Sequence, residues 1–223
     1  MDIQLLYIKI VQKFRTDGLQ ATIRKAFAHL TRRRTTDDFD VRHGTDTAGI
    51  EPLWKFKIRS PNARLGVRYQ ASGEQELVEA VNFLHEDPQT FTFIDLGCGK
   101  GRALLVASKL GFQQVIGVEF ARELVDIARS NLAKMRSSSA VVRHADAAEF
   151  HFPNSDMVVY LYNPFSQEVM RKVVANLRQS PAKRLYVIYS DPKFGQVLDS
   201  SGFLNRLGCP PGLQNIQIWT AVR

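Results

Sequence analysis

A strand-like segment that runs directly into a glycine-rich turn constrains this chain more than any other feature. Residues 91–96 are apolar and aromatic, a composition typical of a buried strand, and Gly97, Gly99 and Gly101 follow at once. A helix is predicted next, over about residues 100–110. Glycine permits positive φ angles and close approach of the backbone to a ligand, and the first turn of a helix presents free N–H groups. This order predicts an α/β fold with a doubly wound, mostly parallel sheet and a ligand site outside the carboxyl ends of its strands.

Strand and helix patterns alternate along the rest of the chain. Further strands are predicted at residues 115–119, 140–144, 157–162, 184–190 and 216–222, and helices at 73–84, 124–135 and 167–177. Such alternation favours a parallel sheet covered by helices on both faces. For the helix over 73–84, Ser72 is the expected N-cap, with Gln75 three residues later.

The first third of the chain has a different character. Apolar residues on one helical face predict two amphipathic helices within residues 2–34. Residues 35–70 lack such periodicity and are rich in turn residues, so we expect loops there, serving as a lid, a binding loop or a tether. We therefore divide the chain into an N-terminal helical and irregular extension, 1–70, and a main domain, 71–223.

Positive charge is concentrated in that extension. Residues 1–70 hold 14 Lys and Arg against 7 Asp and Glu, a net charge of +7 out of +8 for the whole chain. A basic segment of this kind is most simply a solvated face, but it can also bind nucleic acid, an acidic protein or a membrane surface. Nucleic acid is therefore one partner that the sequence leaves open, and the oligomeric state is open as well.

Cysteine content and hydropathy restrict the cellular setting. Cys98 and Cys209 are the chain's two cysteines and form no C-x-x-C pair, so neither a disulfide framework nor a metal site is indicated. There is no recognisable signal peptide and no apolar run long enough to span a bilayer. We expect a cytoplasmic protein with no transmembrane segment.

An acidic residue stands at or just after the end of each of the first three strands of the predicted sheet: Asp95, Glu119 and Asp146. The carboxyl ends of parallel strands meet at one edge of a sheet, so these three acids are expected to line one crevice. The glycine spacing is G-x-G-x-G, whereas dinucleotide binders have G-x-G-x-x-G. A carboxylate at Asp95 would also repel a pyrophosphate and would tolerate a cationic cofactor. An NAD-dependent oxidoreductase is therefore a disfavoured alternative.

The run Asp95–Arg102, together with Val118–Phe120, resembles the class I S-adenosylmethionine-dependent methyltransferase superfamily, and the resemblance extends over about residues 72–223. It implies a Rossmann-like methyltransferase fold, S-adenosylmethionine as the methyl donor and S-adenosylhomocysteine as the product. The cofactor-binding residues it implies, together with their neighbours in the same segments, are Tyr69, Ser72, Asp95, Gly97, Cys98, Gly99, Gly101, Glu119, Phe120, Asp146, Ala147, Asn163, Pro164 and Phe165.

The resemblance also implies a role for each part of this set. Asp95, Gly97 and Gly99 would hold the methionine part of the cofactor, with Tyr69 and Ser72 near the same end. Glu119 would hold the ribose. Phe120, Asp146 and Ala147 would surround the adenine.

The fourth predicted strand ends in Tyr162-Asn163-Pro164-Phe165, and in this superfamily that strand end faces the transferable methyl group. Asn163-Pro164-Phe165 resembles the Asn-Pro-Pro-aromatic signature of enzymes that methylate planar nitrogens, with one proline in place of two. Its spacing is also similar to that of non-SET histone-lysine methyltransferases.

Asn163 and Tyr162 are the predicted catalytic residues, and no residue is identified as a general base. The acceptor is not identified by the sequence, although N-methylation of a protein or small molecule is slightly favoured. The alternative outside catalysis is a methyltransferase-like module that binds nucleic acid or a partner protein.

Overall fold

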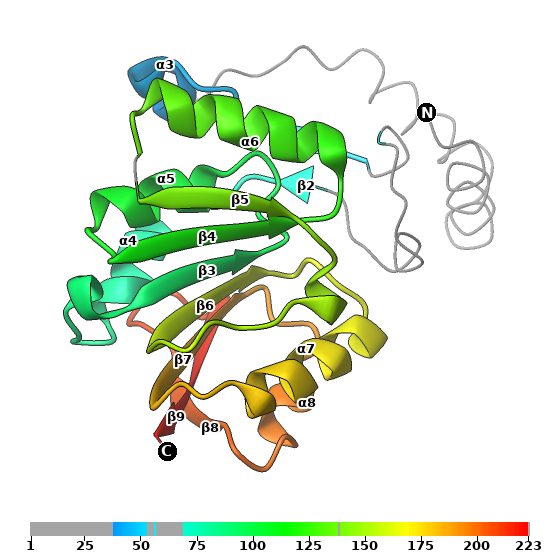
Figure 1. The fold of residues 1–223 in the computed structure, drawn as a ribbon. Helices are drawn as coiled ribbons and strands as arrows, with labels where there is room; N and C mark the ends of the chain where they lie inside the picture. The colour runs from blue at the N-terminus through cyan, green and yellow to red at the C-terminus, as the bar shows by residue number, and fades with distance from the viewer. Residues whose placement is uncertain (1–37, 53–55, 57–68, 138, 223) are drawn as a thin grey trace, which may run out of the picture.

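The computed structural model describes residues 38–52, 56, 69–137 and 139–222, and Figure 1 shows their arrangement. The two helices predicted within residues 2–34 lie outside the described residues, as do parts of the loop region predicted over residues 35–70. The division into two domains at residue 70 stays a prediction.

A seven-stranded sheet forms the centre of the protein, in the order β5-β4-β3-β6-β7-β9-β8. The strands are β3 (Thr92–Leu96), β4 (Gln114–Glu119), β5 (Ala140–His144), β6 (Met157–Tyr162), β7 (Arg184–Ser190), β8 (Asn205–Gly208) and β9 (Ile216–Val222). Strands β3 to β7 are parallel, whereas β9 runs antiparallel to both β7 and β8. The predicted doubly wound, mostly parallel sheet is confirmed.

The sheet changes its winding direction at β3. From this central strand the chain adds β4 and β5 on one side, and then crosses back to add β6 and β7 on the other. All five residues of β3 are buried, as its apolar sequence predicts. The gap between the outgoing loops of β3 and β6 is the topological switch point, where open α/β sheets bind their ligands.

Helices cover both faces of the sheet (Figure 1). One face carries α4 (Glu74–Asn82), α5 (Arg102–Lys109) and α6 (Arg122–Lys134), and the other carries α7 (Gln167–Gln179) and α8 (Gly195–Asp199). Successive residues of β3 point to opposite faces, so Phe93 packs in the first core and Ile94 in the second. Two separate apolar cores therefore hold the sheet and fix the ends of its strands.

Two local predictions are wrong. Residues 38–43 form a helix, α3 (Asp38–His43), in place of part of the expected loop; the acidic residues of its first turn and the basic residues of its last turn suit the helix dipole. Ser72 does not cap α4, whose N-cap is Gly73 without a side-chain hydrogen bond. The Ser72 side chain lies near the Tyr160 hydroxyl instead.

Near α3, the short strands β1 (Ile50–Glu51) and β2 (Tyr69–Gln70) pair antiparallel. In this pair Tyr69 lies opposite Glu51.

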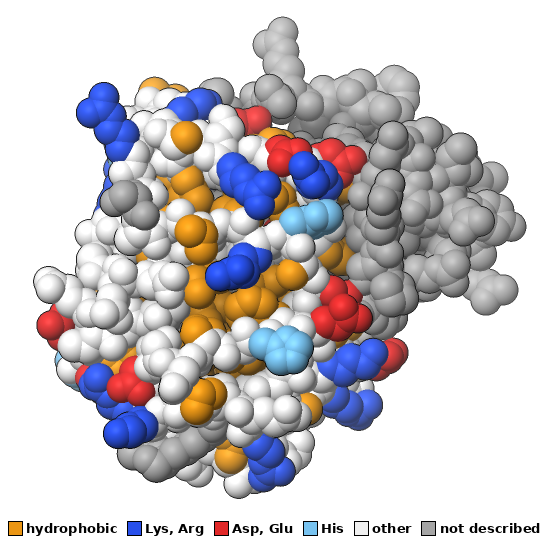
Figure 2. All heavy atoms as spheres, viewed as in Figure 1, with side chains coloured by type: hydrophobic (Ala, Val, Ile, Leu, Met, Phe, Trp, Pro, Cys, Tyr) orange, Lys and Arg blue, Asp and Glu red, His pale blue; other side chains and the backbone are white. Residues whose placement is uncertain are grey.

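Figure 2 shows hydrophobic side chains gathered in the middle of one face, with Lys, Arg and His side chains around them. Within the described ranges, every helix is too short or too polar to cross a membrane. The same ranges contain no cluster of three or more His, Cys, Asp or Glu side chains placed to hold a metal ion. Both cysteines are free thiols.

Candidate cofactor site

A cavity opens at the switch point, over the carboxyl ends of β3, β4 and β6. It encloses about 830 Å³, including the part open to solvent. Twelve of the fourteen predicted cofactor-binding residues line it: Tyr69, Ser72, Asp95, Gly97, Cys98, Gly99, Glu119, Phe120, Asp146, Ala147, Pro164 and Phe165. The structure thus brings together residues from five separate segments of the chain.

The glycine turn lies tightly packed along one wall of this cavity. A Cβ atom on Gly97 would lie 2.8 Å from Cβ of Pro164, and one on Gly99 would lie 2.2 Å from the Tyr69 ring. Both glycines have positive φ angles, of 82° and 53°. Glycine is therefore needed at both positions for two reasons, the backbone conformation and the lack of space.

Gly101, the third glycine of the turn, lies at the start of α5. It is the N-cap of α5, with φ at 86°, and a Cβ on it would meet the Ala128 side chain of α6 at 3.2 Å. It does not line the cavity. Its missing side chain allows α5 and α6 to pack closely behind the turn.

Asp95 lies at the floor of the cavity with 4% of its surface exposed. Burial, and secondarily the charge of Glu119, raises the pKa of its carboxyl to about 8. Among the described residues, none donates a hydrogen bond to this carboxyl. A buried carboxyl without a donor is costly, so Asp95 is suited to receive one from a ligand.

Glu119, at the end of β4, is equally buried but has partners. One carboxylate oxygen accepts the backbone N–H of Gly99 at 2.9 Å, and the other accepts that of Ala121 at 2.9 Å. Burial raises the pKa of Glu119 to about 7 despite these bonds. Each carboxylate oxygen has a second lone pair, so Glu119 can accept further hydrogen bonds from a ligand.

The third acid, Asp146, is only partly buried. One of its oxygens accepts the N–H of Ala148 at 2.9 Å, which caps the short 3₁₀ helix η4 (Ala147–Glu149). Phe120, which is half-buried, lines the same end of the cavity. The following acid, Glu149, is exposed.

Tyr69 and Cys98 belong to the wall rather than to any reactive group. The Tyr69 hydroxyl donates to the carbonyl of Thr47, and burial raises its pKa far above the ordinary value. Burial, together with the charges of Asp95 and Glu119, also raises the pKa of Cys98 well above its ordinary value. Both side chains therefore stay protonated at neutral pH.

The two predicted catalytic residues occupy different positions. Tyr162 lines the cavity, and its hydroxyl accepts a hydrogen bond from Gln70 at 2.7 Å. Asn163 does not line the cavity, although its neighbours on both sides do. It is 5% exposed with φ at 39°, and its amide N–H donates to Asp191 at 3.3 Å. Its side-chain oxygen is buried and has no hydrogen-bond partner among the described residues.

Sequence reasoning missed one charged residue in the cavity wall. Arg102, at the start of α5, lines the cavity and is buried together with Lys100 of the glycine turn. Both cations are held by residues 38–48, in the segment expected to be loop. A basic residue in a helical first turn was the available signal, because it opposes the helix dipole and so indicates a specific partner.

A doubly wound sheet, a glycine turn and two buried acids surround one cavity at the switch point, an arrangement typical of α/β domains that bind a small ligand there. Residues 93–181 match the family model described as a methyltransferase domain. This match indicates a methyltransferase domain in that part of the chain. No curated protein sequence matches it.

Solved structures support the same fold. A putative RNA methyltransferase from Pyrococcus horikoshii is 23% identical, covers 77% of this chain and 95% of its own, and has a TM-score of 0.53. A putative methylase from Haemophilus influenzae is 17% identical, with coverages of 67% and 99% and a TM-score of 0.53. A SAM-dependent methyltransferase from Aquifex aeolicus is 15% identical, with coverages of 67% and 98% and a TM-score of 0.50. At these identities the likeness establishes the fold.

Proposed function

We propose that this chain holds S-adenosylmethionine in the cavity described above and transfers its methyl group to a nitrogen atom of an acceptor that enters beside Tyr162–Phe165. The observation that carries this proposal is the pair of buried carboxyls, Asp95 and Glu119, on one cavity floor. Two such groups disfavour an anionic ligand and favour one that brings positive charge and hydrogen-bond donors.

The residues present fit S-adenosylmethionine. The Asp95 carboxyl, which has no donor among the described residues, would bind the ammonium group of the methionine part. Glu119 would accept hydrogen bonds from the ribose hydroxyls. Phe120 and Ala147 would pack against the adenine, with Asp146 at its edge.

S-adenosylmethionine supplies a methyl group that is already activated by a sulfonium charge. The protein therefore has to bind, orient and exclude water rather than activate the donor. The apolar walls formed by Pro164 and Phe165 are suited to keep water from the reacting centre. The described residues that line the cavity include no histidine to act as a base.

Asn163 supports a nitrogen acceptor. Its amide N–H donates to Asp191, and its side-chain oxygen is a buried acceptor that no other described residue satisfies. An amino group that reached this oxygen would donate a hydrogen bond to it and would be oriented by that bond. A carboxylate substrate has no hydrogen to donate and would not be oriented in this way. The Tyr162 hydroxyl would form the adjacent wall.

The charge of the N-terminal extension bears on which molecule carries that nitrogen. The net charge of +7 on residues 1–70 favours an acidic protein or a nucleic acid over a neutral small molecule. We also propose a cytoplasmic location, since both cysteines are free and suit a reducing compartment.

Titration of S-adenosylhomocysteine into the purified chain by calorimetry, with NAD as the control, tests the cofactor. We expect a dissociation constant in the micromolar range, the order typical of cofactor sites, and no heat with NAD. Preference for NAD, or no binding of S-adenosylhomocysteine, would contradict the proposal.

A second experiment tests the acceptor class. The chain is incubated with S-adenosylmethionine carrying a radioactive methyl group and with separate protein, RNA and small-molecule fractions of a cell extract. We expect transfer to a product whose label survives mild base, as N-methyl groups do. A label released by base as methanol would identify a carboxylate acceptor and contradict a nitrogen target.

A further inference from the structure

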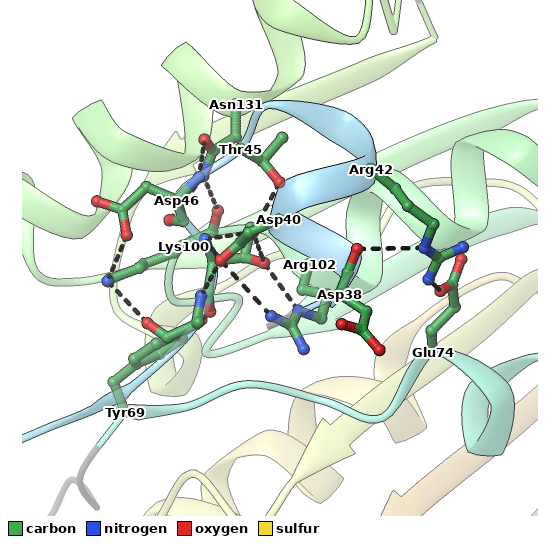
Figure 3. A network of polar contacts seen from close by, with 12 residues as sticks. Asp38, Asp40, Arg42, Thr45, Asp46, Tyr69, Glu74, Lys100, Arg102 and Asn131 are labelled. Atoms are coloured by element: carbon green, nitrogen blue, oxygen red, sulfur yellow. Dashed lines mark hydrogen bonds and ion pairs between the residues drawn. The ribbon is translucent and has the colours of Figure 1, made fainter. Parts of the chain in front are cut away.

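Residues 38–48, which comprise α3 and the turn after it, form hydrogen bonds to Lys100 of the glycine turn and to Arg102 at the start of α5 (Figure 3). We call this segment the strap. Phe39 anchors it in the first apolar core, and its polar side chains form one connected hydrogen-bond network. Those bonds lead to residues that line the cofactor cavity.

Asp40 fixes the conformation of the strap through hydrogen bonds. Its carboxylate is 6% exposed and accepts hydrogen bonds from the Thr45 hydroxyl at 2.7 Å, the Thr47 hydroxyl at 2.7 Å, the Thr47 N–H at 2.9 Å and the Ala48 N–H at 2.6 Å. Burial opposes ionisation of Asp40, but these bonds outweigh it and hold the pKa of the carboxyl below its ordinary value. The carboxylate is thus charged and fixes the turn from residue 45 to residue 48.

Thr47 connects this turn to the cavity wall. Its side chain is fully buried, and its hydroxyl donates to Asp40 while it accepts from Nε of Arg102 at 2.7 Å. Its carbonyl accepts the hydroxyl of Tyr69. Both Arg102 and Tyr69 line the cavity, and the Tyr69 ring lies against Gly99. One residue therefore sets the position of two wall side chains.

A second connection joins the strap to the glycine turn itself. Nζ of Lys100, the residue between Gly99 and Gly101, donates to Asp46 at 3.1 Å and to the Ala48 carbonyl at 3.1 Å. The Asn131 side chain on α6 accepts the Asp46 N–H at 3.0 Å and donates to the carbonyls of Asp46, at 3.1 Å, and Lys100, at 3.0 Å. The strap and the turn are therefore fixed relative to each other.

The strap also determines where the cation in the cavity wall points. Arg102 lies 3.8 Å from the Asp40 carboxylate and stacks over the Phe39 ring at 4.9 Å. These contacts hold the guanidinium on the strap. If the strap released Arg102, its guanidinium would be able to approach the buried carboxyls of Asp95 and Glu119, which line the same cavity.

We propose that the strap is a positioning element of the cofactor site, with Thr47 as its positioning residue: Thr47 fixes Arg102 on the strap and holds Tyr69 against Gly99. This inference rests on the proposed binding of S-adenosylmethionine. It extends the site to a segment that touches the cofactor cavity only through other residues.

The test compares three single variants of the full chain. Thr47→Val keeps the side-chain shape and removes the hydroxyl, whereas Thr47→Ser keeps the hydroxyl. Thr92→Val is the matched control. Thr92 is likewise a buried threonine, and its hydroxyl is hydrogen-bonded to Ser155 at 2.9 Å. It lies at the start of β3, away from the cavity. Each is titrated with S-adenosylhomocysteine, and its thermal midpoint is measured without ligand.

We expect Thr47→Val to raise the dissociation constant about tenfold, the effect of losing a hydrogen bond to a charged group. Thr47→Ser and Thr92→Val should stay within about threefold of wild type. Equal affinity in Thr47→Val and wild type would overturn the proposal, and so would an equal loss in Thr92→Val. If Thr47→Val does not fold, Asp40→Asn takes its place with the same expectation.

Hydrogen exchange without ligand separates this inference from the proposed function. In Thr47→Val the amides of residues 97–102 should exchange faster than in wild type, and in Thr92→Val they should not. Unchanged exchange in Thr47→Val would overturn the positioning role even if the wild-type chain binds S-adenosylhomocysteine. Faster exchange in a chain that binds no S-adenosylhomocysteine would support the positioning of the turn and contradict only the proposed function.

Discussion

The carboxylate of Glu119 accepts the backbone N–H of Gly99 at 2.9 Å, which ties the end of β4 to the glycine turn that follows β3. The same carboxylate accepts the N–H of Ala121 and so also fixes the start of α6. Glu119 thus shapes the turn before any ligand arrives. This arrangement reduces the ordering that the binding of a cofactor would require.

Glu119→Ala removes both of these bonds and the proposed ribose acceptor. We expect S-adenosylhomocysteine to bind more weakly by about 1–3 kcal/mol, the usual loss for a charge-assisted acceptor. Calorimetric titration measures this. Glu149→Ala, which removes an exposed acid of η4, should bind as wild type does. An unaltered affinity in Glu119→Ala would exclude the ribose assignment.

The raised pKa values of Asp95, about 8, and Glu119, about 7, predict how stability depends on pH. The folded protein keeps protons that the unfolded chain releases near the ordinary values of 3.8 and 4.5. The free energy of unfolding should therefore fall as the pH rises from those values, and the loss should be complete above about 8. Asp95→Asn, which stays neutral, should make the dependence shallower.

Thermal unfolding at a series of pH values measures this dependence. Other groups titrate in the same range, so the informative quantity is the difference in slope between wild type and Asp95→Asn. A ligand with an ammonium group favours the ionised carboxyls, so S-adenosylhomocysteine should stabilise the wild type more at about pH 8 than at about pH 6. Equal slopes in the two proteins would contradict a raised pKa for Asp95.

Gly99→Ala tests the packing of the turn. The new Cβ would lie 2.2 Å from the Tyr69 ring, and that ring is held by its hydroxyl bond to Thr47. We expect S-adenosylhomocysteine to bind at least about tenfold more weakly, with a stability loss beyond the roughly 1–2 kcal/mol that a left-handed alanine costs. Gly111→Ala is the matched control, because Gly111 also has a positive φ, of 83°, but has open space around it.

The sheet and the acids at its edge could be predicted because their signals are local. The apolar run over β3 and the strand ends at Asp95 and Glu119 can be identified from a few neighbouring residues, and parallel topology then places both acids at one edge. The strand β8, by contrast, has mostly exposed side chains and therefore carries no apolar pattern from which a strand could be predicted.

The strap could not be predicted for a different physical reason. Its position depends on side-chain hydrogen bonds between residues far apart in sequence, such as Thr47 with Arg102 and Asp46 with Asn131. Phe39 is the one apolar residue of α3 that enters the core, so hydropathy alone gives no periodic signal. The Ser72 cap could not be predicted for a similar reason, because the hydroxyl lies near Tyr160, a residue far away in sequence, and does not bond to the helix N-terminus.

The pair formed by Asn163 and Asp191 gives the last prediction. Both residues have left-handed backbones, with φ at 39° and 51°, and they lie just beyond the ends of the neighbouring strands β6 and β7. If their hydrogen bond orients the Asn163 amide toward an acceptor amine, Asn163→Ala should leave the affinity for S-adenosylhomocysteine within about twofold of wild type and lower methyl transfer at least about tenfold. Calorimetry and label transfer to the cell-extract fractions measure the two quantities separately.

Asp191 should act only through Asn163. Asp191→Ala removes the acceptor of the Asn163 N–H and should lower methyl transfer with little change in cofactor affinity. Asp191→Asn keeps an acceptor oxygen at the same position and should retain most of the activity if its amide presents that oxygen to Asn163. A large loss of cofactor affinity in Asn163→Ala, with normal transfer at saturating cofactor, would place Asn163 in the binding of the cofactor and remove it from the acceptor side.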